Sequence, residues 1–458
     1  MTGQDDPAAG AANPIVAQRC TIVVPSTGEF DSRTFRIASS LSSRGHVVTV
    51  VGRRAPGLPD DERDPSGYRI VRVHVEAIDG LPGPLRSIAH RLRRTSPPVS
   101  SHGGGDARTD ESSATGAPPR RGAVARARRL AAGFWRLGAI ALTVRSQRLA
   151  AHRVAPPADL VHAMAYMGIP VGLDLGRRDS APVIYDSRDI YVDAANLARL
   201  PGPARRLFAR IERGWAHEAT RVITVNDPYA DVMAERFRVE RPLVVLNCSY
   251  RRAPDAVKPR RFHGELGLAP TVRVVLYQGG FSRDRGIEQL IATLPSLPED
   301  IVLVLLGYGI LRPELERIAA DPASHGRLFI LPAVPPAELL EWVASADLVA
   351  MPIQPSTLNH RLTTPNKLLE AMAAGVPVVA SDLPGMAPIV TATGCGVVCD
   401  PTSVAALAAA IRSILDLPAG DQAAIAERAL RAAHDTYNWE SQVAVLLAEY
   451  GRLSGRPW

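Results

Sequence analysis

A lysine and a glutamate three residues apart, at the start of a predicted helix, could bind a phosphate-bearing ligand. Residues 359–375 read NHRLTTPNKLLEAMAAG, which predicts a helix over 364–374. Lys367 and Glu370 would share one face near the helix start, where the backbone amides of Asn366 and Lys367 lack partners. Pyrophosphate on Lys367 and these amides, with ribose hydroxyls on Glu370, would fill such a site. The alternative is an ion pair on the helix surface.

Two glycine-containing turns follow neighbouring predicted strands of the same domain. The first turn, QGGFSRDRG, comes after the strand 272–277, and the second, GYG, comes after the strand 301–306. Glycine lets a backbone approach a ligand closely, and arginine favours an anion there. Because parallel strands end at the same edge of a sheet, both turns would point into one crevice. A purely structural turn is the alternative for each. The candidate binding residues in these turns are Gly279, Gly280, Arg283, Arg285, Gly307 and Gly309.

The elements that position these residues alternate between buried strands and helices. All-apolar strands such as CTIVV, HVVTVVG and IVLVLL, separated by helical patterns, are typical of parallel sheets covered on both faces. The fold class is therefore predicted to be α/β, with two doubly wound, Rossmann-like domains facing each other across a cleft. The predicted segments are a flexible N-terminus (1–17), an N-terminal domain (18–250), a linker (251–270), a C-terminal domain (271–435) and a final helix that packs back on the N-terminal domain (436–458).

An insertion in the N-terminal domain carries most of the positive charge. Residues 95–120 are rich in Ser, Gly and Pro and are predicted to be disordered. Residues 121–153 predict a basic amphipathic helix with an apolar surface of Phe134, Trp135, Leu137, Ile140 and Leu142. Such a helix suits an anionic membrane surface, and the alternative is a helix packed on the sheet with solvated arginines.

The overall composition excludes several classes of protein. The chain has 458 residues, of which 46% are hydrophobic and 22% are charged, as in ordinary globular proteins. Its formal charge is +7, but residues 81–155 contain 14 Arg and 3 acidic residues, a net +11, so the remainder is mildly acidic at −4. The bulk charge is therefore no argument for a nucleic-acid partner. Four cysteines are too few for a secreted disulfide framework, and the polar start lacks a signal peptide, so we expect a cytoplasmic protein, at the inner face of the plasma membrane if the basic helix binds lipid.

The run TPNKLLEAMAAGVPVVASDLPG resembles the nucleotide-sugar-binding signature of family 4 glycosyltransferases, which are retaining enzymes with the GT-B fold. The resemblance includes DSR at 31–33, VIYDSRDI at 183–190 and LGYGILRPELE at 306–316, and covers about residues 18–80 and 159–450. The subtype resembles actinobacterial members. The resemblance implies a sugar nucleotide as donor, transfer with retention of anomeric configuration, and a glycan, lipid-linked or small-molecule acceptor.

Individual positions match this family only in part. Glu370 corresponds to the second glutamate of the family's paired-Glu motif, which holds the donor ribose, whereas Leu362 occupies the position of the first. The family's pyrophosphate-binding Arg and Lys correspond to Gly280 and Arg285, so Arg283 or Lys367 would supply the missing charge. Arg188 stands where the family often has a histidine after the YDS-type strand.

The expected chemistry follows from the charge that forms on the leaving group. Cleavage of a sugar–diphosphate bond makes the leaving group more negative, and Arg285, Lys367 and the helix amides are suited to stabilise it. The chain contains no Asp-x-Asp motif, so we expect neither a metal nor another cofactor. Asp31 is the candidate contact for the acceptor, and a helix cap is the alternative for this residue. Arg188 and Asp189 are candidates for lining the cleft.

Two other functions remain open from the sequence. A sugar-nucleotide 2-epimerase has a similar architecture but needs carboxylates and a histidine at the cleft, and the sequence offers no clear set. A non-catalytic, membrane-associated scaffold of polysaccharide assembly would explain the departures at Leu362, Gly280 and Arg188. A dinucleotide dehydrogenase is disfavoured, because no Gly-x-Gly-x-x-Gly follows a strand.

Overall fold

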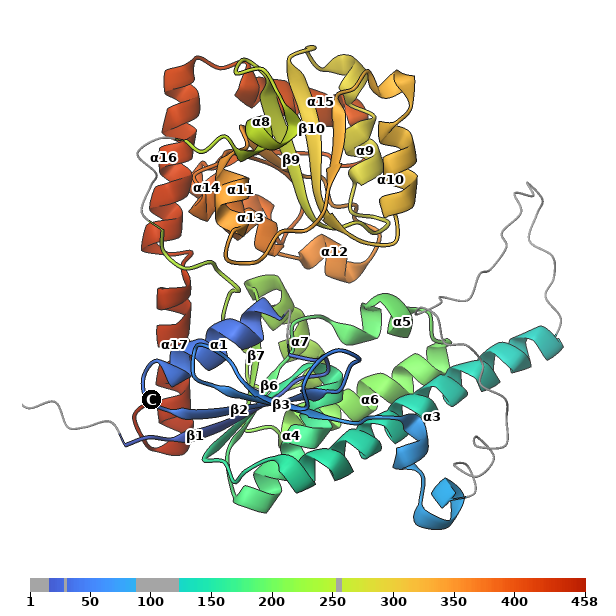
Figure 1. Ribbon diagram of the computed structural model, residues 1–458. Helices are drawn as coiled ribbons and strands as arrows, with labels where there is room; N and C mark the ends of the chain where they lie inside the picture. Colours follow the sequence, from blue (N-terminus) through green and yellow to red (C-terminus); the bar gives the residue numbers. More distant parts are fainter. Residues whose placement is uncertain (1–15, 29–30, 88–122, 253–257) are drawn as a thin grey trace, which may run out of the picture.

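The computed structural model describes residues 16–28, 31–87, 123–252 and 258–458, which form two stacked α/β domains (Figure 1). The predicted disorder at 95–120, and nearly all of the predicted flexible N-terminus at 1–17, lie outside the described residues. The domains have one sheet each, and parallel strands dominate both, which confirms the predicted fold class.

The N-terminal sheet has eight strands in the order β3-β4-β2-β1-β5-β6-β7-β8. Only β3, which pairs with β4, runs antiparallel. The central strands are buried on both faces because their residues are almost all apolar. Their bounds are β1 Arg19–Val23, β2 Val47–Arg53, β3 Asp61–Arg63, β4 Arg69–Val73, β5 Leu160–Met164, β6 Val183–Asp186, β7 Arg221–Thr224 and β8 Leu243–Val244. The helices of this domain are α1 Ser32–Ser42, α3 Ala123–Val154, α4 Ala165–Asp179, α5 Ala195–Ala198, α6 Gly202–Glu218 and α7 Asp227–Phe237, with short 3-10 turns at Ala77–Gly80 and Tyr191–Asp193.

The C-terminal sheet has six parallel strands in the order β11-β10-β9-β12-β13-β14. One apolar cluster fills each face of this sheet. The strands are β9 Arg273–Gly280, β10 Ile301–Tyr308, β11 Leu328–Leu331, β12 Leu348–Met351, β13 Val378–Ser381 and β14 Gly396–Cys399. The helices are α8 Arg261–Leu266, α9 Ile287–Ile291, α10 Arg312–Ala319, α11 Leu339–Ala344, α12 Leu358–Leu362, α13 Asn366–Ala373, α14 Ala387–Thr393, α15 Val404–Leu415 and α16 Ala419–Asp435, with 3-10 turns at Leu294–Ser296 and Pro322–Ser324.

The last helix, α17 Trp439–Ser454, belongs to the core of the N-terminal domain (Figure 1). The Trp439 and Tyr450 side chains are fully buried there. The Trp439 indole Nε1 donates a 2.8 Å hydrogen bond to Ser40 Oγ on α1. The chain therefore returns to its first domain after completing the second.

The predicted linker 251–270 is wrong over its second half. Residues Arg261–Leu266 form α8, and the Phe262 side chain is fully buried in the C-terminal core. Its ring lies 5.2 Å from that of Trp342, edge to face. Leu266 and Leu268 also pack against this core, so buried apolar side chains join the segment to the domain although most of the predicted linker is polar.

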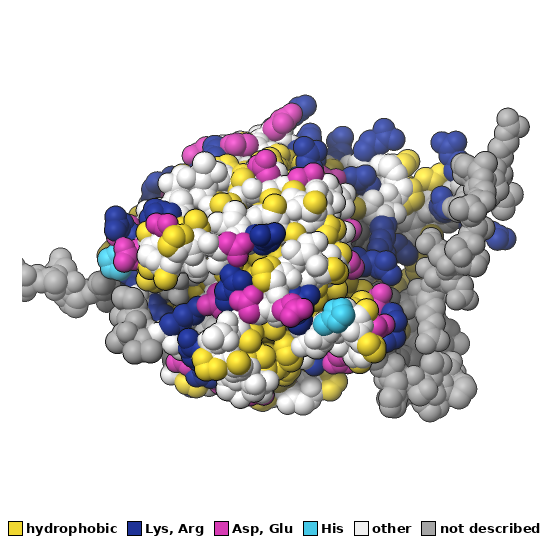
Figure 2. All heavy atoms as spheres, turned by 90° about the horizontal axis from the view of Figure 1, so that it is seen from above, with side chains coloured by type: hydrophobic (Ala, Val, Ile, Leu, Met, Phe, Trp, Pro, Cys, Tyr) yellow, Lys and Arg dark blue, Asp and Glu magenta, His cyan; other side chains and the backbone are white. Residues whose placement is uncertain are grey.

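The basic segment is a helix, α3, but it does not present the single apolar surface predicted for it. Leu137 and Ile140 pack against a cluster of the N-terminal domain, whereas the Phe134 and Trp135 side chains are 45% and 80% exposed. Later in the helix, Val144 and Ala151 are buried. The helix therefore packs on the domain along its second half. Only its start, before Gly133, projects beyond the domain (Figure 1), because a Cβ on Gly133 would lie 2.5 Å from the Pro201 ring. Basic side chains gather at the right of Figure 2, and the exposed arginines of α3 include Arg126, Arg128, Arg129 and Arg136.

None of the helices in the described ranges is both long enough and apolar enough to cross a membrane.

Candidate functional site

The helix α12 of the C-terminal domain docks onto the N-terminal domain beside the loops that follow its strands. The Asn359 side chain accepts a 2.9 Å hydrogen bond from the Ile190 amide and donates a 3.1 Å bond to the Ile190 carbonyl. The Tyr229 hydroxyl donates to the Asn359 carbonyl at 3.1 Å. The Asn226 side-chain amide donates to the Leu362 carbonyl at 2.7 Å. These contacts hold the two domains against each other at the cleft.

Leu362, which stands where the resembling family has its first glutamate, belongs to this interface. Its side chain and that of Leu358 pack against a core cluster of the N-terminal domain. A carboxylate there would be placed among apolar side chains rather than beside a ligand. The departure at Leu362 therefore has a structural reason, and this residue is not part of the polar site.

Lys367 is the most unusual group in the cleft. Its side chain is only 9% exposed, and its Nζ is buried without a hydrogen-bond partner among the described residues. The ammonium lies 3.5 Å from the centre of the Tyr277 ring. Burial and the nearby guanidinium of Arg285 lower the pKa of Lys367 well below its ordinary value. An anion bound beside Nζ would reverse this effect and restore the charge.

Glu370 faces three polar groups from three different elements. Its Oε2 accepts a 2.7 Å hydrogen bond from Nε2 of Gln278, at the end of β9. Arg36, on α1 of the N-terminal domain, and Lys367, on α13, interact with it electrostatically. Burial raises the pKa of Glu370, while these three neighbours oppose the rise. Sequence reasoning identified Glu370 but missed Gln278 and Arg36, because no local spacing links them to α13.

The glycines predicted to cradle a ligand have different roles. Strands β9 and β10 continue through Gly280 and Tyr308, so the predicted turns begin later than expected. A Cβ on Gly307 would lie 1.9 Å from the Gly279 carbonyl oxygen, and one on Gly309 would lie 2.3 Å from the Phe281 carbonyl oxygen. These two glycines are required for strand packing. Gly279, with φ +116°, leaves space beside the Lys367 side chain, where a Cβ would stand 3.8 Å from Nζ. Gly280 is exposed.

The predicted cations of the first turn are placed differently. Arg285 is half-buried and interacts electrostatically with Lys367 and with Asp189 of the other domain. Arg283 is exposed on the same loop. Asn366 begins α13, and its side chain is exposed. The structure thus gathers Lys367, Glu370 and Arg285 and leaves Arg283 at the rim.

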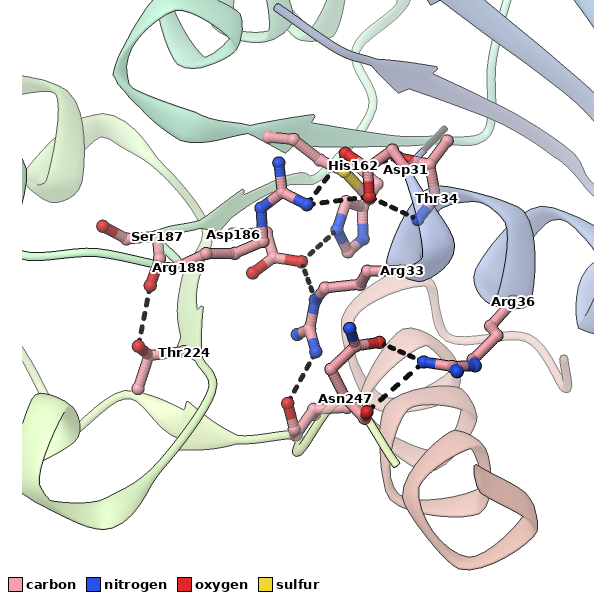
Figure 3. A network of polar contacts seen from close by, with 12 residues as sticks. Asp31, Arg33, Thr34, Arg36, His162, Asp186, Ser187, Arg188, Thr224 and Asn247 are labelled. Carbon is pink, nitrogen blue, oxygen red and sulfur yellow. Dashed lines mark hydrogen bonds and ion pairs between the residues drawn. The ribbon is translucent and has the colours of Figure 1, made fainter. Parts of the chain in front are cut away.

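On the N-terminal side, Arg188 and Asp31 form one unit (Figure 3). Nη1 of Arg188 donates to both carboxylate oxygens of Asp31 at 2.8 Å. Asp31 also caps α1 by accepting a 3.1 Å bond from the Thr34 amide. The neighbouring Asp189 is a separate carboxyl group, and burial raises its pKa to about 6, although Arg188 and Arg285 oppose this.

A buried polar network supports the loop that carries Arg188 (Figure 3). Arg33 donates from Nε to Asp186 Oδ2 at 2.6 Å, and His162 Nε2 lies 3.1 Å from the same oxygen. His162 Nδ1 lies 2.6 Å from the Tyr450 hydroxyl of α17. Burial alone would raise the pKa of Asp186, but Arg33 and His162 hold it well below its ordinary value. The network fixes the end of β6, from which the Arg188 loop departs.

Comparisons with known proteins agree with this architecture. Residues 272–416 match the family described as Glycosyl transferases group 1. The chain is 27% identical over 330 residues to D-inositol 3-phosphate glycosyltransferase of Xylanimonas cellulosilytica, a match that covers 69% of the chain and 77% of the relative. Matches to mycobacterial relatives of the same name span less than two thirds of those proteins.

Solved structures show the same fold at low identity. Sucrose-phosphate synthase from Thermosynechococcus elongatus is 18% identical with a TM-score of 0.69, over 96% of this chain and 99% of that one. Anabaena Alr3699/HepE in complex with UDP-glucose is 18% identical with a TM-score of 0.57, over 94% of this chain and 100% of that one. The chain has the GT-B fold, and its C-terminal domain and relatives together support a glycosyltransferase.

Proposed function

We propose that this chain transfers a sugar from a nucleoside diphosphate sugar to an acceptor, with retention of anomeric configuration. The observation that carries the proposal is the Lys367 ammonium, which is buried 3.5 Å from the Tyr277 ring centre and coupled electrostatically to Glu370. Its Nζ has no hydrogen-bond partner among the described residues. Burial and Arg285 disfavour the charge on Lys367, and Glu370 only partly offsets them, so an anion bound beside Nζ would stabilise the ammonium.

The donor is held by residues of the C-terminal domain. Its diphosphate would lie on Lys367, Arg285 and the first amides of α13, and its ribose on Glu370. We propose uridine as the nucleoside, because HepE, which shares the fold, has been solved with UDP-glucose. Arg285 and Lys367 stabilise the negative charge that grows on the leaving diphosphate, so no metal is assigned to the reaction.

The acceptor approaches from the N-terminal side, where Arg188 and Asp31 lie. Asp31 holds the Arg188 guanidinium through two oxygens, so this cation is fixed in place rather than free to follow a substrate. In retention, the acceptor hydroxyl attacks on the face from which the diphosphate leaves, and that leaving group can take up its proton. The protein then contributes mainly position and charge.

We also propose that the N-terminal half of α3 binds an anionic membrane surface through its exposed side chains, so that a lipid-linked acceptor or a growing glycan reaches the cleft. This half displays Arg126, Arg128, Arg129 and Arg136, together with exposed Phe134 and Trp135. Arginines contribute about 1 kcal/mol each near anionic lipid, and aromatic rings insert at the interface. Localisation at the inner face of the plasma membrane and a role in polysaccharide assembly belong to this proposal.

Product analysis tests the proposed reaction. Labelled UDP-glucose is incubated with the chain alone and with candidate acceptors, and the anomeric configuration of the product is read by NMR. Release of UDP with an α-configured product supports retaining transfer from this α-linked donor. A β-configured product would contradict retention, and a 2-epimer of the donor would show an epimerase instead.

A further inference from the structure

Gln278 is a buried amide with one satisfied and one unsatisfied end. Its side chain is 3% exposed at the end of β9. Nε2 donates to Glu370 at 2.7 Å, whereas Oε1 has no hydrogen-bond partner among the described residues. Buried amide oxygens without partners are rare in native proteins, because losing water without gaining a partner is unfavourable. The arrangement indicates that a bound molecule supplies the missing donor.

The unsatisfied oxygen lies beside a second acceptor. In the part of the chain that the structure describes, Glu370 is hydrogen-bonded through Oε2 only. The two atoms of one amide are about 2.3 Å apart, so Gln278 Oε1 lies within about 5 Å of the Glu370 carboxylate. Two neighbouring oxygen acceptors match two hydroxyls on adjacent carbons, each of which can donate one hydrogen bond. The ribose of a nucleotide offers such a pair.

Gln278 also gives Glu370 a polar neighbour, which Leu362 cannot provide. Leu362 packs on the N-terminal domain, so this position of α12 contributes no polar side chain beside Glu370. Gln278 reaches Glu370 from the sheet instead, and its N–H fixes one carboxylate oxygen. A carboxylate held by one donor keeps its other lone pairs directed outward for a ligand.

We propose that Gln278 is a positioning and specificity residue of the nucleotide site, which orients Glu370 through Nε2 and accepts one ribose hydroxyl at Oε1. The inference rests on the proposed function, because it assumes that a nucleotide occupies the cleft. It assigns the recognition of the ribose diol to Glu370 and Gln278 together.

Calorimetry with UDP, 2′-deoxy-UDP and 3′-deoxy-UDP tests this assignment without relying on a variant. In the native chain, each deoxy analogue is expected to bind about ten-fold more weakly than UDP, since each leaves a buried acceptor unpaired. In Gln278→Leu, UDP is expected to bind about ten-fold more weakly than to the native chain. One of the two deoxy analogues should then bind to the variant as tightly as UDP does. Gln422→Leu is the control, because the Gln422 side chain lies away from Glu370 and donates to the Leu415 and Leu417 carbonyls.

The pH dependence of UDP affinity distinguishes a role of Gln278 in orienting Glu370 from a purely structural role. The groups that face Glu370 are Gln278, Arg36 and Lys367, and the Gln278 hydrogen bond lowers the pKa of Glu370. Removing that bond raises the pKa of Glu370, so Glu370 becomes protonated at a higher pH in Gln278→Leu. As the pH is lowered, UDP affinity should therefore begin to fall at a higher pH in the variant than in the native chain.

Three results would overturn the inference: equal loss of affinity for UDP and both analogues in Gln278→Leu, no loss at all, or equal binding of all three by the native chain. A native chain that binds neither UDP nor GDP would instead overturn the proposed function.

Discussion

Glu212, on α6, keeps its carboxyl group inside the N-terminal domain. The side chain is 2% exposed and accepts a 2.8 Å hydrogen bond from the Tyr185 hydroxyl. Burial raises its pKa to about 7, from 4.5 in an unfolded chain. The protonated form therefore stabilises the fold fully below pH 4.5, and this contribution is lost as pH rises through 7.

Glu212→Gln is expected to remove this pH dependence. Glutamine keeps an acceptor for Tyr185 but cannot ionise, so the free energy of unfolding at pH 8 should rise by about 3 kcal/mol, at about 1.4 kcal/mol per pKa unit, with little change at pH 4.5. Urea unfolding at both pH values measures the difference. Glu235→Gln, at an exposed position of α7, should change neither value. An equal effect at both pH values would contradict the assignment.

The sequence predicted those site residues that lie close together in the chain. Lys367 and Glu370 are three residues apart on one helix, and their spacing alone places them together. Gln278 and Arg36 reach the same carboxylate from β9 and α1, and no sequence period connects those elements. Gly307 and Gly309 show the converse, because a glycine needed for strand packing is indistinguishable in sequence from one that approaches a ligand.

At the scale of elements, α12 determines how the domains meet. Its polar groups bond to Ile190, Tyr229 and Asn226, and its leucines pack on the N-terminal core. The family resemblance aligns Leu362 with the first glutamate of the paired-Glu motif, which this chain lacks. The docking of α12, a contact between distant segments, turns that position toward the other domain.

Leu362→Glu tests this view of α12. Restoring the family's residue should not strengthen UDP binding, since the carboxylate would face apolar side chains. It should lower the free energy of unfolding by about 1–3 kcal/mol, the cost of burying an unpaired polar group. Calorimetry and urea unfolding measure the two effects, with Leu362→Met as the conservative control. Tighter UDP binding in the glutamate variant would show that position 362 does reach the ligand.

The helix α3 shows a limit of sequence periodicity. The sequence predicted a basic amphipathic helix over 121–153, and Ala123–Val154 is helical. Its apolar residues, however, are divided between packed ones such as Leu137 and exposed ones such as Phe134 and Trp135, and no sequence pattern marks which are which. Which apolar side chains remain exposed depends on contacts with the cluster that includes Phe208.

At the scale of the whole molecule, we expect the exposed aromatic side chains of α3 to bind the protein to an anionic membrane. Phe134→Ala combined with Trp135→Ala is expected to reduce binding to vesicles containing phosphatidylserine at least ten-fold, while UDP affinity stays unchanged. Vesicle flotation measures the binding, and Leu207→Ala, an exposed leucine on α6, is the control. Equal flotation of the native chain and the double variant would contradict a role for these rings.

The last helix, α17, packs in the core of the N-terminal domain. Trp439→Ala removes a fully buried indole and its bond to Ser40, and is expected to cost about 3–5 kcal/mol of unfolding free energy. The loss should appear in the N-terminal domain, which contains the cluster around Trp439. Hydrogen exchange resolves this location. Loss of protection confined to the C-terminal domain would contradict it.

The central claim is that the buried Lys367 ammonium binds the diphosphate of a nucleotide. The chain's only other lysine, Lys258, is half-exposed and paired with Asp347, so it provides a matched control. Calorimetric titration of UDP into Lys367→Met, Lys258→Met and the native chain tests the claim directly. We predict a loss of about thirty-fold, or about 2 kcal/mol, for Lys367→Met only, since a charged hydrogen bond is removed. Equal affinity of Lys367→Met and the native chain would contradict the account.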